Sequence, residues 1–369
     1  MIKFRANQKD FQNALGIASR AVATLTTMPI LNCVLLEVGS KRATIVGNDM
    51  EKSIESEVAV DVDEQGVIAV NAKMLLEIIR KLPDRDFTFD CDDNYTITIK
   101  SGKAKFAISG QDPHDFPELV NVESENSITI SQGLLRKMIQ STIFSVAQGD
   151  SNNKLMTGEL FEVNDGSITI TALDGHRLSI RRGDINDSVV NQKVVVPSET
   201  LREIMRILPD DWKSDVNIYF SKSHIVFELD GVRAVSRLID GEFFDIGRVT
   251  RNDITTKVTV NRSELCKSLD RSLLLVRDNT KTPIIFDISG NIMNLSINSS
   301  VGKFDESTEC VHEGSDMVVA FNPKLLLEAL NAIDDDEVVM HMSGEKSPCY
   351  IKDDAGTYNY IVLPVNFVR

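Results

Sequence analysis

The chain has 369 residues, of which 42% are hydrophobic and 26% charged, and its formal net charge at pH 7 is −15. This composition excludes a disordered chain, and no apolar stretch approaches the roughly 18 residues of a membrane span. The first residues lead into a polar helix rather than a secretory signal, and the five cysteines stand singly without Cys-x-x-Cys spacing. We expect reduced thiols, a cytoplasmic location and no contact with membranes.

The first predicted element is a helix over residues 8–20, in which Phe11, Leu15 and Ala18 share one side. A second helix is predicted over residues 72–82. In both, apolar residues recur every three or four positions, as is typical of an amphipathic helix with one face on a core.

Strands follow the second helix. Residues 87–91 alternate between apolar and polar, and residues 97–99 do the same after the turn residues 92–94. A period of two on either side of Asp and Asn predicts a β-hairpin. The same pattern returns at residues 216–220 and 225–229.

Four more amphipathic helices are predicted along the chain: residues 131–142, 198–208, 262–275 and 323–333. Ser263 is the predicted N-cap of the helix over 262–275. The connections between strands are too short for helical crossovers, so we expect antiparallel sheets and an α+β fold.

Two separate markers indicate that the chain repeats itself three times. The helix with the Leu-Pro-Asp ending recurs, faintly in its last copy, at residues 74–84, 200–210 and 325–335. A strand motif recurs at residues 45–49, 170–174 and 295–299. The spacing is 125 or 126 residues at each step, which is the size of a whole domain rather than a solenoid repeat. We predict three similar domains, residues 1–123, 124–250 and 251–369.

Charge is distributed unevenly between the helices and the rest of the chain. The six helix windows contain thirteen basic and seven acidic residues, whereas the remaining residues carry a net charge of −21. A basic set of helices in an acidic protein can mark a functional surface. Helix faces also carry Lys and Arg for solubility alone, so this distribution leaves both interpretations open.

Four separated segments, residues 27–31, 112–117, 173–178 and 361–365, resemble the bacterial DNA polymerase III β subunits, the sliding clamps. Together with the triplication, the resemblance extends over the full chain in order. It implies a processivity factor: a head-to-tail homodimeric ring whose helices face duplex DNA and whose sheets form the outer wall. The implied partners are the polymerase III catalytic subunit, the clamp loader, and other polymerases and repair proteins that carry clamp-binding motifs.

The resemblance implies which residues would face DNA. Basic residues there would contact phosphates without reading sequence, as a sliding ring requires. Leu25 and Ser198-Glu199 lie near positions where relatives often place basic residues facing DNA. The matching candidates are Lys73, Arg80, Lys81, Arg136, Lys137 and Arg202.

The resemblance also implies that a strand edge of the first domain pairs with one of the third domain of a second copy, which would cover both edges. The basic and acidic residues of the two sides would favour correct pairing. The matching residues are Lys103, Lys105, Phe106 and Ile108 on the first-domain side, and Leu273, Leu274, Asp305, Glu306 and Glu309 on the third-domain side.

A peptide-binding pocket between the second and third domains is the last implied site. Partner motifs would insert apolar side chains there. Leu173, Phe244 and Asn366 depart from the residues common in relatives, so we expect an altered motif preference. The matching residues are Leu155, Leu173, Gly175, His176, Arg177, Leu178, Phe244, Arg248, Val249, Val362, Leu363, Pro364 and Val365.

Two other functions are compatible with parts of the sequence. One is a monomeric scaffold that binds peptides without encircling DNA. The other is a hydrolase that uses Asp174 and His176, although Asp49, the repeat counterpart of Asp174, has no histidine beside it. The five histidines lack metal-ligand spacing, and no phosphate-binding glycine loop of the GxxxxGK type is present, so we expect no cofactor, no metal and no catalysis.

Overall fold

The computed structural model describes residues 1–83, 85–122, 126–149, 153–164, 166–185, 190–249, 254–276 and 282–367. The side chains of Arg248 and Val249 lie outside this description. The chain forms two compact units. Unit 1 comprises Met1–Gly133 and Arg206–Leu238, and unit 2 comprises Leu134–Met205 and Ile239–Arg369.

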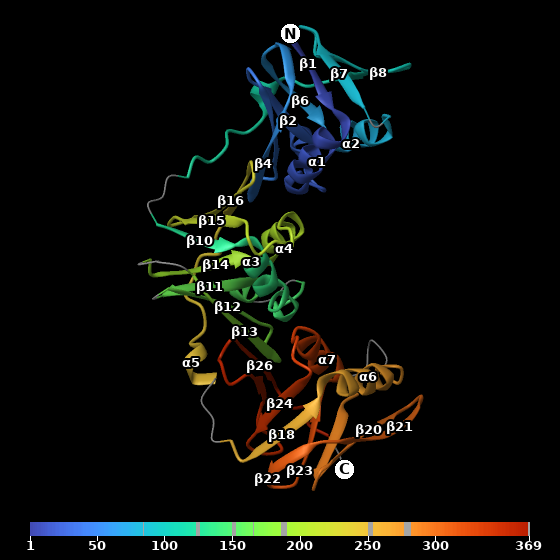
Figure 1. Cartoon of the computed structure of the whole chain (residues 1–369), viewed down its shortest axis with the longest axis vertical. Helices are drawn as coiled ribbons and strands as arrows, with labels where there is room; N and C mark the ends of the chain where they lie inside the picture. The colour runs from blue at the N-terminus through green and yellow to red at the C-terminus, as the bar shows by residue number, and fades with distance from the viewer. Residues whose placement is uncertain are drawn as a thin grey trace. The chain divides into compact units, whose positions relative to one another are not determined.

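In unit 1, helices α1 (Gln8–Ala18) and α2 (Ala72–Lys81) lie side by side (Figure 1). The described strands of this unit form two sheets. The first has the order β5 (Asp61–Glu64), β1 (Ile2–Asn7), β7 (Asp86–Cys91), β8 (Thr96–Ser101) and β9 (Ala104–Ser109). The second has the order β10 (Ser127–Ser131), β15 (Asp215–Phe220), β16 (His224–Leu229), β17 (Val232–Arg237), β4 (Lys52–Ala59), β3 (Arg42–Asn48), β2 (Cys33–Val38) and β6 (Gly66–Asn71).

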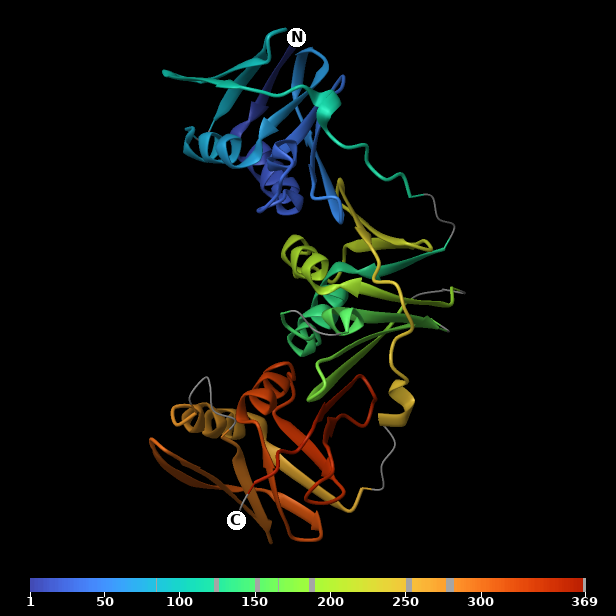
Figure 2. The ribbon, with the colours of Figure 1, turned by 180° about the vertical axis from the view of Figure 1, so that it is seen from behind.

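Unit 2 repeats this plan. Helices α6 (Arg262–Leu273) and α7 (Pro323–Asn331) lie side by side in both views (Figures 1 and 2). One sheet has the order β14 (Gln192–Pro197), β11 (Gly158–Asn164), β12 (Ser167–Leu173), β13 (Arg177–Asp184), β26 (Tyr358–Val362), β25 (Cys349–Lys352), β24 (Glu337–Met342), β18 (Thr256–Asn261) and β22 (Val311–Gly314). The other has the order β21 (Gly302–Glu309), β20 (Ile292–Ser299), β19 (Ile284–Ser289) and β23 (Met317–Phe321).

Three further α-helices complete the description: α3 (Gln132–Gln140), α4 (Ser198–Ile207) and α5 (Ile246–Val249). Short 3-10 turns lie at η1 (Ser19–Ala21), η2 (Pro29–Asn32), η3 (Pro113–Asp115), η4 (Ile143–Ser145) and η5 (Lys154–Thr157). The predicted helices and both predicted hairpins are therefore present close to their expected bounds.

The core of unit 1 shows why the apolar periods predict these elements. Phe4 of β1 stacks on Phe89 of β7 with ring centroids 4.9 Å apart, and Phe11 of α1 meets Phe87 edge-on at 5.2 Å. All four rings are buried. Aromatic pairs in these geometries add about 0.5–1.5 kcal/mol beyond the burial of their area, so they fix α1 on the sheet.

Asparagine caps four of the helices. The side-chain oxygens of Asn7, Asn71, Asn261 and Asn322 accept backbone N–H groups at the starts of α1, α2, α6 and α7. The prediction that Ser263 caps α6 is wrong, because the helix begins at Arg262 and Asn261 accepts the Glu264 N–H at 3.0 Å. Asn satisfies an orphan donor of the first turn as well as Ser does.

Strands from consecutive predicted domains join in two places. Lys52 of β4 lies opposite Ser236 of β17, and Arg177 of β13 lies opposite Val362 of β26. Unit 1 therefore contains strands of both the first and the second predicted domain. The predicted boundaries after residues 123 and 250 lie outside the described residues and stay a prediction.

The strand ladders of the described sheets are antiparallel, so the predicted α+β class is confirmed. The cysteines are free thiols, as predicted, and all except Cys266 are buried. Among the described helices, none combines the length and the apolar composition needed to span a bilayer.

Candidate functional site

The turn between β12 and β13 is organised by Asp174. Its Oδ1 accepts the backbone N–H groups of His176 at 2.9 Å and Arg177 at 3.1 Å. Gly175 between them has a φ of +88°, a conformation that glycine adopts without steric cost. The turn leaves the side chain of His176 exposed.

The pairing of β13 with β26 brings the C-terminal segment to this turn. Leu178 lies opposite Ile361, and the backbone N–H of Leu363 donates to the His176 carbonyl at 2.9 Å. Beyond it, the Val365 N–H donates to the Ala320 carbonyl at 2.8 Å. Residues that are almost 190 positions apart in the sequence thus meet in one backbone ladder.

A buried apolar cluster underlies the turn and the C-terminal segment. Above it lie side chains that reach solvent: Phe244 and Leu363 are each 38% exposed, and Leu155 is half-buried. Phe244 contacts Phe243 of the cluster with ring centroids 5.7 Å apart. The cluster consists of Leu160, Leu173, Leu178, Val195, Phe243, Tyr350 and Ile361.

We call the residues above this cluster the C-terminal apolar surface: Leu155, His176, Phe244, Leu363 and Pro364. The structure therefore brings most of the predicted pocket residues together. Leu173 and Leu178 belong to its buried floor, Val362 is buried in a different core cluster, and Gly175 shapes the turn. Val365 is half-buried next to Pro364. For Arg248 and Val249 only the backbone, at the end of α5, is described.

Arg177 is among the predicted pocket residues, and its guanidinium points into the protein. The side chain is 8% exposed, and Nε donates to Asp174 Oδ2 at 3.0 Å. The other two nitrogens donate to Glu328 of α7 and to the Phe144 carbonyl. The guanidinium also lies 5.2 Å from the centroid of the Phe144 ring. Arg177 supports the turn and does not present its charge to the solvent.

The predicted dimer residues lie on two sheet edges. Strand β9 ends the five-stranded sheet, and in the described residues no strand pairs with its outer side. Lys103 and Lys105 are exposed, Phe106 is 37% exposed, and Ile108 is half-buried. This edge is basic and partly apolar.

Strand β21 ends the four-stranded sheet in the same way. Asp305 and Glu309 are exposed on it. Glu306 instead accepts Arg271 Nε of α6 at 3.0 Å, and this guanidinium lowers the pKa of the Glu306 carboxyl. At the end of α6, Leu273 is half-buried, and Leu274 directly after it is 83% exposed. This edge is acidic with an apolar neighbour.

The predicted DNA-facing residues fall into two groups. Lys73, Arg80 and Lys81 are exposed on α2, opposite its buried face. Arg136, Lys137 and Arg202 of α3 and α4 are half-buried, and Lys137 Nζ pairs with Asp334 at 2.8 Å. The first group presents its charge to solvent more fully than the second.

A hollow of about 590 Å³ in unit 1 gathers further basic residues. Its walls are formed by α1, α2, the end of α4 and the β16–β17 turn, and they contain Arg20, Arg80 and Arg206 against one acidic residue, Asp230. The sequence marks Arg20 and Arg206 as basic helix residues, but only the fold places them beside Arg80.

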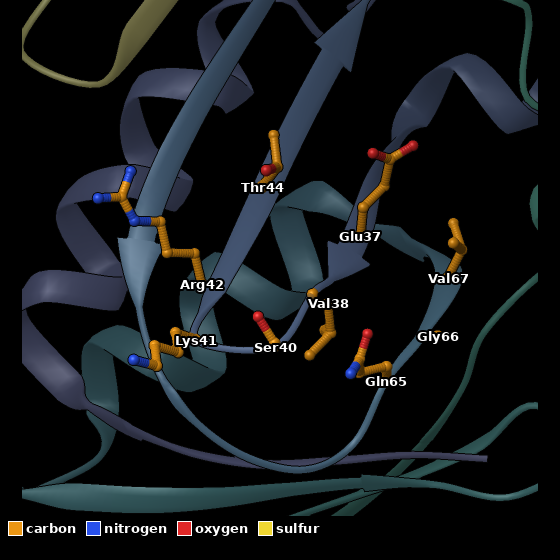
Figure 3. Close-up of a pocket in the computed structure, with 10 residues that line it drawn as sticks. Glu37, Val38, Ser40, Lys41, Arg42, Thr44, Gln65, Gly66 and Val67 are labelled. Carbon is orange, nitrogen blue, oxygen red and sulfur yellow. The ribbon is translucent and has the colours of Figure 1, made fainter.

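A second hollow, of about 720 Å³, lies beside the β2–β3 turn (Figure 3). Glu37, Lys41, Arg42 and Gln65 are among the residues that line it. Arg42 pairs with Glu57 at 2.5 Å. None of the predicted site residues lines this hollow.

The chemistry of Asp174 bears on the hydrolase hypothesis. Its two oxygens accept two backbone N–H groups and the Arg177 guanidinium. An acid that orients a catalytic histidine would instead accept from the imidazole ring. Among the described residues, no group of three His, Cys, Asp or Glu side chains is arranged to hold a metal ion.

Comparison with known proteins covers the whole chain. Family models of the DNA polymerase III beta subunit match in succession: the N-terminal domain at residues 2–120, the central domain at 129–245 and the C-terminal domain at 248–366. The beta sliding clamp of Staphylococcus epidermidis is 28% identical over 376 residues, and the alignment covers 99% of each chain.

Solved structures give the same result. A candidate DNA polymerase III beta subunit from Eubacterium rectale is 43% identical, and the DNA polymerase sliding clamp of Bacillus subtilis is 28% identical. Each has a TM-score of 0.96, with full coverage of both chains. The three-domain architecture predicted from the repeat is thus confirmed.

Proposed function

The chain belongs to the family of DNA polymerase III beta subunits, the bacterial sliding clamps, and we propose how its surfaces perform that role. Two copies close head to tail around duplex DNA, and the ring tethers the polymerase to its template. The observation that carries this proposal is the pair of open sheet edges with opposite charge, β9 and β21.

Closure joins β9 of one copy to β21 of the other. An open edge is a template for uncontrolled pairing, and a mutual contact between two different edges removes that hazard in a closed ring. Lys103 and Lys105 would face Asp305 and Glu309, and Phe106 would bury its exposed ring. The charges select the partner edge, while apolar burial supplies most of the affinity.

DNA is held by topology and by weak contacts with phosphates. Lys73, Arg80 and Lys81 are the strongest candidates because they are exposed, and we add Arg20 and Arg206 from the basic hollow. Arg136, Lys137 and Arg202 would contribute less, since they are half-buried. Contacts of this kind are sequence-independent and weaken as salt rises, so the ring can slide.

Partners dock on the C-terminal apolar surface. Phe244 and Leu363 offer apolar area that a short peptide could cover, with His176 as a polar neighbour. The proposed ligands are motifs of the polymerase catalytic subunit, the clamp loader, other polymerases and repair proteins. We propose that the protein acts in the cytoplasm and has no catalytic site of its own.

The test uses the assembled ring. We expect light scattering to give about 82 kDa, twice the chain mass of 41.0 kDa, as a closed pair of copies requires. After loading onto nicked circular DNA by the cognate clamp loader, the protein should remain bound and should be lost when the circle is cut. Equal loss from circular and linear DNA would contradict the topological mechanism, and a strict monomer would favour the peptide-binding scaffold.

A further inference from the structure

Arg177 joins three parts of the chain at one buried point. Its side chain begins in the β12–β13 turn, which carries His176 of the C-terminal apolar surface. Its guanidinium reaches Glu328, which lies 151 residues further along the chain on α7, and the Phe144 carbonyl. The Glu328 side chain is 31% exposed and the Arg177 side chain 8% exposed. Charged pairs this well shielded are held more rigidly than surface pairs.

The turn does not require the contact with α7. In the repeat-equivalent turn between β3 and β4, Asp49 accepts two backbone N–H groups and pairs with Lys52, three residues further on. That turn has the same hydrogen-bond pattern with a single ammonium group. The pair Asp174–Arg177 is therefore explained by its role in holding the turn together. The pair Arg177–Glu328 has no such role in the local fold.

The pair Arg177–Glu328 ties the turn to α7. Asp174 and Glu328 bind different nitrogens of one planar guanidinium, so a shift of the α7 carboxylate changes where Arg177 holds Asp174. Asp174 in turn fixes the backbone of His176, whose carbonyl accepts the Leu363 N–H. His176 and Leu363 both belong to the C-terminal apolar surface.

We propose that Glu328 is a positioning residue for partner binding. It holds Arg177, and through Arg177 it holds the β12–β13 turn in the geometry that receives an apolar peptide. Glu328 is not part of the C-terminal apolar surface. The inference rests on the proposed docking function of that surface. It assigns to α7, a helix of the third repeat, control over a turn of the second.

The experiment measures peptide affinity with the full-length protein. Fluorescein-labelled peptides tiled along the cognate polymerase catalytic subunit identify the tightest binder by fluorescence anisotropy, and that peptide is then the probe. Glu328→Gln keeps the side-chain shape and removes the charge. The matched control is Asp334→Asn, which removes another ion pair between the second repeat and the region of α7, Lys137–Asp334 at 2.8 Å.

We expect Glu328→Gln to weaken binding of the probe about three- to tenfold, and Asp334→Asn to leave it unchanged. Far-UV circular dichroism and thermal melting establish that both variants are folded. In an Arg177→Met background the Glu328→Gln change should have no further effect, because a positioning role acts only through Arg177. A general loss of stability would persist in that background.

The outcomes separate the two proposals. If no tiled peptide binds the unmodified protein, the docking function itself is wrong. If a peptide binds and Glu328→Gln has no effect, or if both single variants weaken binding equally, the positioning role is wrong and the docking function stands. An additive loss in the Arg177→Met background would also overturn the positioning role.

Discussion

The β3–β4 turn of the first repeat and the β12–β13 turn of the second stand 125 residues apart and have the same backbone design. In each, an aspartate accepts the N–H groups two and three residues ahead, at 3.0 and 2.8 Å for Asp49 and at 2.9 and 3.1 Å for Asp174. In each, the next residue has a positive φ, +77° at Met50 and +88° at Gly175. Each turn begins a strand that pairs with a strand of the following repeat.

The side chains around the two turns differ. The first turn borders a hollow of about 50 Å³ whose lining residues are mostly of polar or charged types and include Ser53, Glu118, His224 and Arg237. Burial and the nearby Arg237 lower the pKa of His224. The second turn lies on the apolar cluster and reaches α7 through Arg177. The repeat preserves the turn while its surroundings diverge, and we expect this divergence to decide which of the two turns lies beside a surface that binds an apolar partner.

The largest expected effect comes from a substitution in the buried apolar cluster beneath the β12–β13 turn. Phe243 is 5% exposed in the cluster, so Phe243→Ala should cost about 3–5 kcal/mol of unfolding free energy and abolish peptide binding. Glu118 lines the hollow at the first turn and is exposed, and Glu118→Ala should stay within about 0.5 kcal/mol. Urea unfolding and the anisotropy assay measure both changes. Similar losses of unfolding free energy and of peptide binding at the two positions would contradict the contrast between the surroundings of the two turns.

A second contrast concerns Glu159 of β11, whose counterpart 125 residues earlier is the buried Val34. Glu159 is fully buried, and neither carboxyl oxygen has a hydrogen-bond partner among the described residues. Burial raises the pKa of this carboxyl from 4.5 to about 8, and the nearby Thr142 hydroxyl and Arg202 guanidinium offset only part of that rise. The folded protein therefore holds a proton that the unfolded chain releases.

The stability of the folded protein should therefore fall as the pH rises. The contribution of Glu159 to stability is fully present below pH 4.5 and is lost as the pH rises to about 8, at a rate of up to about 1.4 kcal/mol per pH unit. Glu159→Gln removes the titration. Urea unfolding between pH 5 and pH 8 should show a shallower decline for the variant, and parallel profiles would show that Glu159 is ionised in the folded state.

The local structure around both turns could be predicted from the sequence, whereas contacts between residues far apart in the chain could not. The helices and hairpins follow from apolar periods within a dozen residues. Asn residues stand directly before α1, α2, α6 and α7, although the pattern at α6 predicts Ser263 in place of Asn261. The inward direction of Arg177 depends on Phe144 and Glu328, which lie 33 and 151 residues away. Nothing in the turn itself distinguishes Arg177 from Lys52, so resemblance alone placed it in the pocket.

The same limit applies to the candidate surfaces. Charge and repeat indicate basic helices, but the grouping of Arg20, Arg80 and Arg206 depends on how α1, α2 and α4 pack. The engagement of Glu306 by Arg271 similarly depends on the packing of α6 against β21. Side-chain partners set by tertiary packing are the part that a single sequence leaves open.

Exchanging the cations of the two turns sharpens the comparison. Arg177→Lys keeps a charge for Asp174, but one ammonium group cannot also satisfy Glu328 and the Phe144 carbonyl, so we expect a loss of about 1–2 kcal/mol and weaker peptide binding. Lys52→Arg should change peptide binding by less than about twofold. Anisotropy and urea unfolding of the two variants provide the measurement. Unchanged peptide binding in Arg177→Lys would show that the contact between Arg177 and α7 does not control the β12–β13 turn.

The smallest expected effect exchanges the residues at positive φ. Met50 is 53% exposed at a φ of +77°, so its side chain contributes little packing, while its backbone is in a region that favours glycine. Met50→Gly should therefore raise the unfolding free energy by about 0.5–1 kcal/mol. Gly175→Ala is the reverse change, and an added Cβ there meets no atom within 4 Å, so the expected loss of about 1 kcal/mol measures the backbone alone. Thermal melting of the two variants should shift in opposite directions. A loss of stability in Met50→Gly would mean that the Met50 side chain packs against the residues around the β3–β4 turn. The two turns would then be less alike than their backbones indicate.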